Sequence, residues 1–341
     1  MKIIATAAAA ALVATVCSAA GALADPLEIK IGWATTPTHM QPIIDALQKK
    51  HPELFHHFGK SYVAEGVHFQ GSTPQIQALA IDDLAIAAFG PEALALAANN
   101  AHLDVRMVAD VFQDGVPGYR TVQYVVRADS PIHKVEDLKG KKVASNAIGS
   151  FGDSAMRVML HKHGITDRDV TTVETKFPTM PAMLMDGKVD LINLLPQYDH
   201  FLKDKQFRVL FTAAQGEGRI QAQLWAMRAE FIKAHRPALV DFFEDHIRAV
   251  EWLLSPGHHD EVVEMVAAVT KAKPQEVAYA YTKGDSYHAP DARPDIPGTQ
   301  KAIDLQVELG LMQKGLKLAP QYVDLSLVDE ANQRLGKQHG G

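Results

Sequence analysis

The chain has 341 residues, 47% of them hydrophobic and 22% charged, with a formal net charge of −6 at pH 7. That length can support two lobes with separate cores. The mildly acidic charge argues against a nucleic-acid partner, which would need a basic face. Cys17 is the only cysteine, so no internal disulfide is expected.

The first 24 residues have the features of an export signal. Lys2 gives a positive start, an alanine-rich apolar stretch follows, and Ala22-Leu23-Ala24 fits the small-x-small cleavage rule. An uncleaved membrane anchor is the alternative, but alanine is a weak hydrophobe for that role. Lipidation of Cys17 is not expected, because the residue before it is Val16. We therefore expect cleavage after Ala24 and a periplasmic mature protein.

Strands and helices alternate in the next part of the chain. The segment LEIKIGWA (27–34) alternates apolar and polar residues and predicts an opening strand. The elements expected after it are a helix at 40–50, a strand at 61–69, a helix at 74–80, a strand at 84–89, a helix at 92–98 and a strand at 105–111. This order predicts an α/β fold with a mainly parallel sheet flanked by helices.

Two glycine-rich breaks, at 113–118 and 215–218, divide the chain. Between them, strand and helix patterns alternate again, beginning with the strand TVQYVVR (121–127) and including a helix at 153–163 and a strand at 189–194. After the second break the pattern predicts helices only, at 228–235, 238–254, 260–269, 274–281 and 299–311.

Two segments far apart in the chain follow one plan. IQALAIDDLAIAAFG (76–90) and MPAMLMDGKVDLINLLP (180–196) each read as a short helix, an acidic turn, an apolar strand and a new helix start. The repetition suggests two sheets built alike. The alternative is that any α/β protein repeats this plan.

Three turns before helices could hold a ligand. Gly71-Ser72-Thr73-Pro74 and Gly149-Ser150-Phe151-Gly152-Asp153 offer backbone N–H groups and a helix dipole, which favour an anion or a carbonyl oxygen. The glycines allow a close approach, and Phe151 supplies an apolar wall. Gly90-Pro91-Glu92 carries its own acid and is a poorer anion site. Ordinary helix capping is the alternative for each turn taken alone.

Other candidate ligand contacts follow expected strand ends. Gln197 can donate and accept hydrogen bonds, and Tyr198 can stack or donate. Thr36 and His39 follow the first strand, and the imidazole could pair with an anion. Arg120 lies near a predicted crossing point and could hold an anion bidentately, with a surface role as the alternative.

Signatures of catalysis and of metal binding are missing. The sequence has no Gly-x-Ser-x-Gly, no Walker loop and no GxGxxG. The densest histidine groups, at 56–57, 161–163 and 258–259, lack HExxH spacing. We expect no enzyme activity, no metal and no cofactor.

The segment ADSPIHKVEDLKGKKVASNAIGSFGDSAMRVMLHKHGI (128–165) resembles the second-lobe opening of periplasmic substrate-binding proteins of ABC importers. The branch it resembles includes the nitrate, taurine, alkanesulfonate and thiamine-precursor binders (NMT1/THI5-like). AMLMDGKVDLINLLP (182–196) is similar to a family element with Gly187 and Asp190 in place. GSTPQIQALAIDDLAIAAFG looks like its first-lobe counterpart, where Asp82 and Ala85 depart from the pattern. YVDLSLVDEANQRLG (322–336) resembles the closing segment.

The resemblance implies the two-lobed, type II periplasmic-binding-protein fold. It places the first lobe at 25–119 and 216–341 and the second lobe at 120–215, with a ligand in the cleft between them. The ligand contacts it implies are Thr36, His39, Ser72, Thr73, Gly90, Ser150, Phe151, Gly152, Gln197 and Tyr198. The implied partners are a small-molecule ligand and the membrane subunits of an ABC permease, and a monomer is expected.

The function expected from these features is capture of a small organic anion, a sulfonate such as taurine or a carboxylate, for an ABC importer. Facing helix starts favour an anion, and the aromatic residues favour an organic body. The alternatives are a thiamine-pyrimidine precursor, nitrate or bicarbonate as ligand, an enzyme of the same fold, and a receptor that presents its ligand to a sensor protein.

Overall fold

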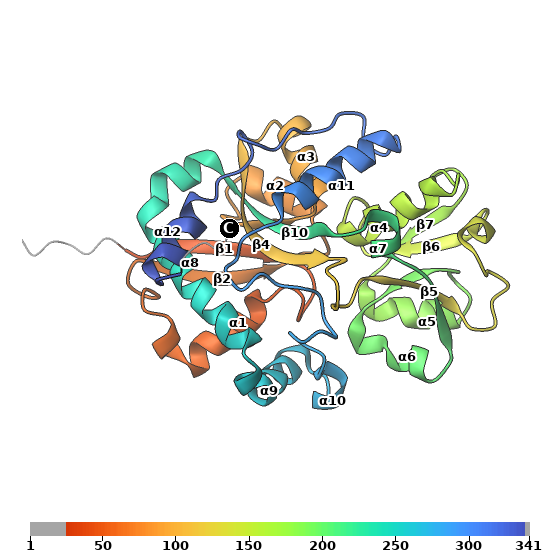
Figure 1. Ribbon diagram of the computed structural model, residues 1–341, viewed down its shortest axis with the longest axis horizontal. Coiled ribbons are helices and arrows are strands. Elements are labelled where there is room, and N and C mark those ends of the chain that lie inside the picture. The colour runs from red at the N-terminus through yellow and green to blue at the C-terminus, as the bar shows by residue number, and fades with distance from the viewer. Residues whose placement is uncertain (1–24, 338–341) are drawn as a thin grey trace, which may run out of the picture.

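The computed structural model describes residues 25–337, which fold into two groups of elements joined side by side (Figure 1). Cys17 and the predicted cleavage site lie outside the described residues. Within residues 25–337, no helix combines the length and the hydropathy that crossing a membrane requires.

The larger group, which we call the first lobe, is built on five strands. β1 (Leu27–Trp33) pairs in parallel with β2 (Tyr62–His68). A parallel bridge from Ile31 to Ile86 then links β1 to the segment that leads into β3 (Ala87–Phe89). The last strand, β10 (Ile220–Arg228), lies between β3 and β4 (Val105–Asp114) and is antiparallel to both.

The second lobe repeats this plan with other strands. β6 (Lys142–Ser145) and β7 (Thr171–Glu174) are parallel, and a bridge from Val143 to Leu191 links β6 to the segment before β8. β5 (Gln123–Arg127) lies between β8 (Ile192–Leu194) and β9 (Phe207–Thr212) and is antiparallel to both. In each lobe the paired strands thus include one parallel pair and one central strand that is antiparallel to both of its neighbours.

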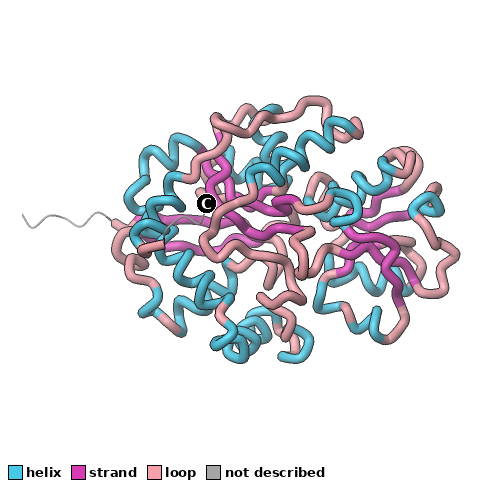
Figure 2. The backbone as a smooth tube through the Cα atoms, in the orientation of Figure 1, coloured by secondary structure: helices cyan, strands magenta, loops and turns pink. Residues whose placement is uncertain are grey.

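Helices cover both sheets (Figures 1 and 2). Those of the first lobe are α1 (Gln41–Lys50), α2 (Thr73–Ala80), α3 (Pro91–Asn99), α8 (Ala229–Leu254), α9 (His259–Thr270), α10 (Pro274–Val277), α11 (Ile296–Glu308) and α12 (Ser326–Arg334). Those of the second lobe are α4 (Phe151–Lys162), α5 (Met180–Met185), α6 (His200–Lys203) and α7 (Ala213–Glu217). Single 3-10 turns cover Pro52–Leu54, Val135–Leu138, Phe177–Thr179, Pro196–Tyr198 and Pro256–His258.

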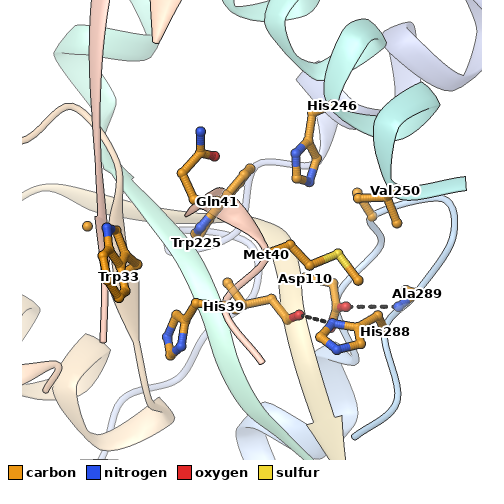
Figure 3. Close-up of a pocket in the computed structure, with 13 residues that line it drawn as sticks. Trp33, His39, Met40, Gln41, Asp110, Trp225, His246, Val250, His288 and Ala289 are labelled. Atoms are coloured by element: carbon orange, nitrogen blue, oxygen red, sulfur yellow. Dashed lines mark hydrogen bonds between the residues drawn. The ribbon is translucent and has the colours of Figure 1, made fainter. Parts of the chain in front are cut away.

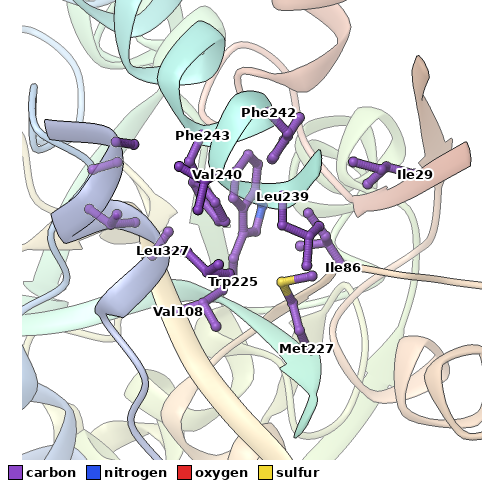
Figure 4. Packing of buried hydrophobic residues seen from close by; sticks show 14 of the residues in the cluster. Ile29, Ile86, Val108, Trp225, Met227, Leu239, Val240, Phe242, Phe243 and Leu327 are labelled. Atoms are coloured by element: carbon purple, nitrogen blue, oxygen red, sulfur yellow. The ribbon is translucent and has the colours of Figure 1, made fainter. Parts of the chain in front are cut away.

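The core of the first lobe is centred on β10 and α8. Trp225 of β10 lies against Phe242 and Phe243 of α8, with ring centroids 5.8 Å and 6.0 Å away (Figure 4). All three side chains are at least 96% buried. Because β10 is the central antiparallel strand, eight of its nine residues are buried. Its pairing with β4 joins the strand that leads out of the first lobe to the strand that leads back into it.

Two expectations about the elements were wrong. The chain after 218 does not become purely helical, because β10 comes first. Gln221 and Gln223 gave β10 a polar appearance, yet both are buried, and Gln221 Nε2 donates to Asp110 Oδ1 at 2.6 Å. The break expected at 215–218 lies largely within α7. The break expected at 113–118 begins inside β4, because this strand continues to Asp114. The two helices expected at 228–235 and 238–254 are confirmed as the two parts of α8, which are separated by a kink at the non-helical His235, next to Pro237.

Candidate functional site

Loops at the carboxyl ends of strands from both lobes surround one cavity between the lobes, which we call the inner chamber. It has a volume of about 670 Å³, part of which is open to solvent, and its lining includes residues that follow β1 and β2 in the first lobe and β6 and β8 in the second. Open α/β sheets bind ligands at this edge, outside the carboxyl ends of their parallel strands. The inner chamber is therefore the candidate ligand site.

The lining of the inner chamber is polar on part of its surface and aromatic or aliphatic on the rest. Its polar side chains include Ser72, Arg120, Asn146, Ser150, Asn193 and Gln223. Its apolar walls are Phe112, Val122, Phe151, Phe177, Leu194 and Leu195. Arg120 is the only lining residue with a permanent charge among those the structure describes, and no carboxylate lines the chamber there.

The first turn of α4 offers hydrogen-bond donors to the chamber. Ser150 is the N-cap residue, and its hydroxyl donates to Asn146 Oδ1 at 2.9 Å instead of capping the helix. The backbone N–H groups of Phe151 and Gly152 donate to no other described residue. A Cβ atom on Gly152 would lie 2.9 Å from Asn193 Nδ2, so only glycine lets this turn pack there. Unpaired N–H groups at the start of a twelve-residue helix favour an anion.

Ser72 has a different role from the capping one expected. It stands at the N-cap position of α2, but its hydroxyl makes no cap hydrogen bond. The hydroxyl oxygen accepts from the Gly90 backbone N–H and from Gln223 Nε2, both at 3.2 Å. Ser72 therefore ties three separate segments of the first lobe together and orients the Gln223 amide at the chamber wall.

His39 is a buried, neutral ring at the chamber. Burial lowers the pKa of its imidazole to about 4. Its Nδ1 lies 3.1 Å from both the hydroxyl and the carbonyl oxygen of Thr35, whereas Nε2 has no hydrogen-bond partner among residues 25–337. A neutral ring cannot attract an anion as an imidazolium would. His39 can instead exchange a single hydrogen bond with a ligand.

Behind His39 lies a second, smaller cavity inside the first lobe, which encloses about 390 Å³ (Figure 3). Trp33, Gln41, His246 and His288 line it, and each has a buried polar atom without a hydrogen-bond partner in the described chain. All of this cavity's lining comes from the first lobe. It therefore cannot sense whether the lobes are open or closed, and the inner chamber is the better candidate site.

Arg120 lines the chamber but is already partly engaged. Its Nη2 donates to Asp199 Oδ1 at 2.7 Å and to the Leu194 carbonyl at 3.3 Å. Nε and Nη1 donate to no other described residue. Nε and Nη1 lie on different edges of the guanidinium, so a bidentate anion contact of the kind expected from the sequence would have to share Nη2 with these partners.

A larger cavity, which we call the vestibule, adjoins the inner chamber and has a volume of about 1710 Å³, part of which is open to solvent. Thr35, Asn146, Phe177 and Leu195 are among the residues that line both cavities, so the two cavities share part of their walls. Residues that line the vestibule alone include Thr36, Lys176, Gln197, Tyr198, Lys271 and Tyr279.

Hydrogen bonds join the lobes on either side of the vestibule. On one side Gln70 Nε2 donates to the Asn146 carbonyl at 2.6 Å, and Asn146 Nδ2 donates back to the Gln70 carbonyl at 3.0 Å. On the other side the Tyr279 hydroxyl donates to Gln197 Oε1 at 3.1 Å. The structure thus shows the two lobes in direct contact around the cleft.

The residues expected to contact ligand fall into three groups. Six of them line the inner chamber: His39, Ser72, Arg120, Ser150, Phe151 and Gly152. Three line the vestibule: Thr36, Gln197 and Tyr198. Two line neither cavity: Thr73, whose hydroxyl donates to the Ile148 carbonyl across the cleft at 2.9 Å, and Gly90, whose N–H is taken by Ser72.

Sequence reasoning missed Phe112, Asn146, Asn193 and Gln223. Asn146 follows β6 and Asn193 lies in β8, so the ends of the expected strands could have indicated both. Gln223 gave no such signal, because its strand was not predicted.

Comparison with solved structures identifies the fold as that of type II periplasmic binding proteins. The chain is similar to the alkanesulfonate-binding protein SsuA from Xanthomonas axonopodis pv. citri bound to MOPS (TM-score 0.66, 20% identity, 87% of this chain and 98% of that one covered). It is also similar to the periplasmic nitrate-binding protein NrtA from Synechocystis PCC 6803 (TM-score 0.69, 13% identity, 91% and 89% covered). A third similar structure is that of a DszB mutant in complex with biphenyl-2-sulfinic acid (TM-score 0.60, 13% identity, 90% and 99% covered).

The family model described as "NMT1/THI5 like" matches residues 67–257, more than half of the sequence. The chain belongs to this family, as the resemblance of residues 128–165 indicated.

Proposed function

We propose that this protein is a periplasmic solute-binding protein that holds a small organic anion in the inner chamber and delivers it to an ABC importer. The observation that carries the proposal is the first turn of α4. There, two unpaired backbone N–H groups, of Phe151 and Gly152, and the remaining nitrogens of Arg120 line a chamber without carboxylates. Such donors in a partly dehydrated cleft stabilise negative charge.

An organic body suits the chamber better than a bare inorganic ion. Phe112 and Phe151 lie edge to face with ring centroids 6.0 Å apart, and Phe177 lines the same chamber. These rings offer apolar surface to a hydrocarbon but no hydrogen bonds to an ion such as nitrate. A sulfonate such as taurine, or a carboxylate, is therefore the proposed ligand, and the likeness to SsuA supports the sulfonate.

A thiamine-pyrimidine precursor is the second candidate, and one observation favours it. Most polar groups of the chamber are neutral: the amides of Asn146, Asn193 and Gln223, and the imidazole of His39 with its pKa near 4. Neutral donors and acceptors next to aromatic rings suit a heterocycle. Nitrate or bicarbonate would be bound only by the backbone N–H groups in the first turn of α4.

Catalysis is the weaker proposal, although DszB shares the fold. The only cysteine, Cys17, belongs to the proposed export signal. The His39 ring has too low a pKa to act as an efficient base near neutral pH. We also propose a monomer with its first lobe at 25–119 and 216–341 and its second lobe at 120–215. Delivery to a sensor protein is the alternative to delivery to a permease.

Two measurements on protein exported from the full-length chain test the proposed function. Mass spectrometry identifies any small molecule that copurifies. A thermal-shift screen compares taurine, alkanesulfonates, carboxylates, nitrate, bicarbonate and aminopyrimidines, and we expect at least one organic anion to raise Tm. Stabilisation by pyrimidines alone would favour the second candidate, and stabilisation by no class would contradict the small-ligand proposal.

Substitution of Arg120 separates anionic from neutral ligands. Arg120→Met should weaken binding of an organic anion by about tenfold or more, and should leave binding of a neutral pyrimidine nearly unchanged. Arg127→Met is the matched control, because Arg127 also pairs with an aspartate, Asp129, but lines neither the chamber nor the vestibule. Equal weakening by both variants would contradict a direct role for Arg120.

A further inference from the structure

The vestibule differs from the inner chamber in the charge of its lining. Lys176 of the second lobe and Lys271 of the first lobe both line it, as do His68 and His200. Neither lysine has a carboxylate partner or another side-chain hydrogen bond within the described part of the chain. The vestibule therefore has unpaired positive charge supplied by both lobes.

Little negative charge offsets these lysines. Glu276 is the only carboxylate that lines the vestibule among the described residues. Its Oε2 already accepts the Lys273 backbone N–H at 3.1 Å, in the capping box of α10. Hydrogen bonds across the cleft keep the two lobes together on either side of this cavity, so the like charges face one shared space. An anionic group there would reduce their repulsion.

Three of the five residues that line both cavities are apolar, and the other two, Thr35 and Asn146, are polar. Phe177 and Leu195 line both the chamber and the vestibule, and so does Ala34. On the vestibule side, the buried hydroxyl of Thr36 has no hydrogen-bond partner among residues 25–337. From the inside outwards, the cleft thus offers anion donors, a junction with three apolar residues, and then cations with a free hydroxyl.

We infer that the cleft accepts an elongated ligand with a negative group at each end and an apolar middle, such as a dicarboxylate or a sulfonated carboxylate. This inference rests on the proposed function, in which the inner chamber holds the first anionic group. The second group lies in the vestibule between Lys176 and Lys271, and the apolar middle passes Phe177 and Leu195. The lysines then determine specificity, because a singly charged ligand of the same length gains nothing from them.

The test uses ligand pairs of equal length: heptanoate against heptanedioate, and hexanesulfonate against 6-sulfohexanoate. Calorimetric titration of the wild type should show the doubly charged member of each pair binding about tenfold more tightly at low salt. The preference should shrink as salt is raised, because both lysines are exposed and screening weakens such pairs. The double variant Lys176→Gln/Lys271→Gln should bring each pair to within about twofold, with binding of the singly charged members unchanged.

The matched control is Lys205→Gln/Lys233→Gln, which removes the same charge from exposed lysines, one in each lobe, that line no part of the cleft. Lys205 has φ of 55° and Lys271 has φ of 56°, so the control also matches the left-handed backbone. The control should keep the tenfold preference.

Three results would overturn the inference. Equal binding of both members by the wild type would contradict the vestibule subsite and leave the proposed function intact. A preference for the doubly charged compounds that persists in Lys176→Gln/Lys271→Gln would also contradict the vestibule subsite and leave the proposed function intact. Failure of all four compounds to bind would also overturn the inference, whereas the organic-anion proposal is tested separately by the thermal-shift screen, which includes taurine.

Discussion

Two of the regions through which the lobes contact each other differ in their chemistry. At the rim of the cleft, the turn before α2 contacts the turn before α4 through uncharged groups, such as the Thr73 hydroxyl and the Ile148 carbonyl. Behind the chamber, α3 contacts α4 near two buried carboxyl groups, Glu92 and Asp153. One oxygen of each carboxyl has no hydrogen-bond partner in the described residues.

Because of this difference in chemistry, one region affects closure of the lobes and the other affects the stability of the fold. Rim groups can exchange their hydrogen bonds for water when the lobes separate, so the rim costs little to open. Burial disfavours the charged form of the carboxyl groups behind the chamber and raises the pKa of Glu92 to about 7. We therefore expect the rim to control ligand affinity and the back contact to control how stability depends on pH.

The largest effect should come from adding a single atom at the rim. In Gly71→Ala the new Cβ would lie 2.8 Å from the Ala147 Cβ of the other lobe, too close for the lobes to meet as they do. Overpacking of this kind costs about 1–3 kcal/mol, which would weaken ligand binding by roughly five- to 150-fold. Calorimetry with the ligand found by thermal shift measures the loss.

Gly257→Ala is the control for this variant, since a Cβ there would meet only the Ser255 hydroxyl, at 3.8 Å. Scattering should show a larger radius of gyration for Gly71→Ala than for the control. Unchanged affinity in Gly71→Ala would mean that the ligand does not require contact at the rim.

The second effect concerns pH and the back contact. Because the pKa of Glu92 rises from 4.5 to about 7, the folded protein retains a proton between these values that the unfolded chain releases. Glu92 therefore makes the free energy of unfolding fall as pH rises through this window. Glu92→Gln should flatten the dependence and stabilise the protein by about 2 kcal/mol at pH 8 relative to the wild type, with little change at pH 5.

Urea unfolding at pH 5 and pH 8 measures this effect, and Asp83→Asn, at an exposed carboxylate, is the control. The free energy of unfolding of Glu92→Gln should still depend on pH, because burial also raises the pKa values of Asp153 and Glu217. The positive charge of Arg157 lowers the pKa of Glu92 and so opposes the effect of burial. An identical pH dependence in Glu92→Gln and the wild type would contradict a buried, titrating Glu92.

The smallest effect should come from one hydrogen bond at the rim. Thr73→Val keeps the shape of the side chain and removes its bond to the Ile148 carbonyl. The bond is exposed, so its loss should cost about 0.5–1 kcal/mol and weaken ligand binding two- to fivefold without changing Tm of the ligand-free protein. Thr172→Val, at an exposed threonine without a side-chain hydrogen bond, should bind like the wild type. An equal loss of ligand affinity in both variants would contradict a role for the rim hydrogen bond in ligand binding.

Much of the fold and part of the site could be predicted from the sequence, for local reasons. The start of α4 is indicated by its own residues, since Gly149 with φ of 76° and the Ser150 N-cap mark the turn directly. Helix α5, Met180–Met185, opens the segment 180–196, which was expected to begin with a short helix, and α3 differs from expectation by one residue at each end. In these elements periodicity and turn residues agree with the surrounding structure.

Prediction failed where burial depends on distant partners. Gln223 is polar and its strand was missed, yet Ser72, 151 positions earlier, holds its amide at the chamber. Glu92 looked like an ordinary acid in a helix start, and only contact with α4 buries it. Lys176 and Lys271 gave no signal of a shared cavity, because they belong to different lobes.

The sequence by itself determined the α/β alternation, the family, and the turns whose backbone N–H groups serve the chamber. These features depend on neighbouring residues, and a turn or a repeating apolar pattern is readable within one segment. Only the tertiary structure decided which turns meet, which polar side chains are buried, and where unpaired charge gathers. Those properties arise when segments a hundred or more residues apart exclude water from each other, and no local pattern encodes that pairing.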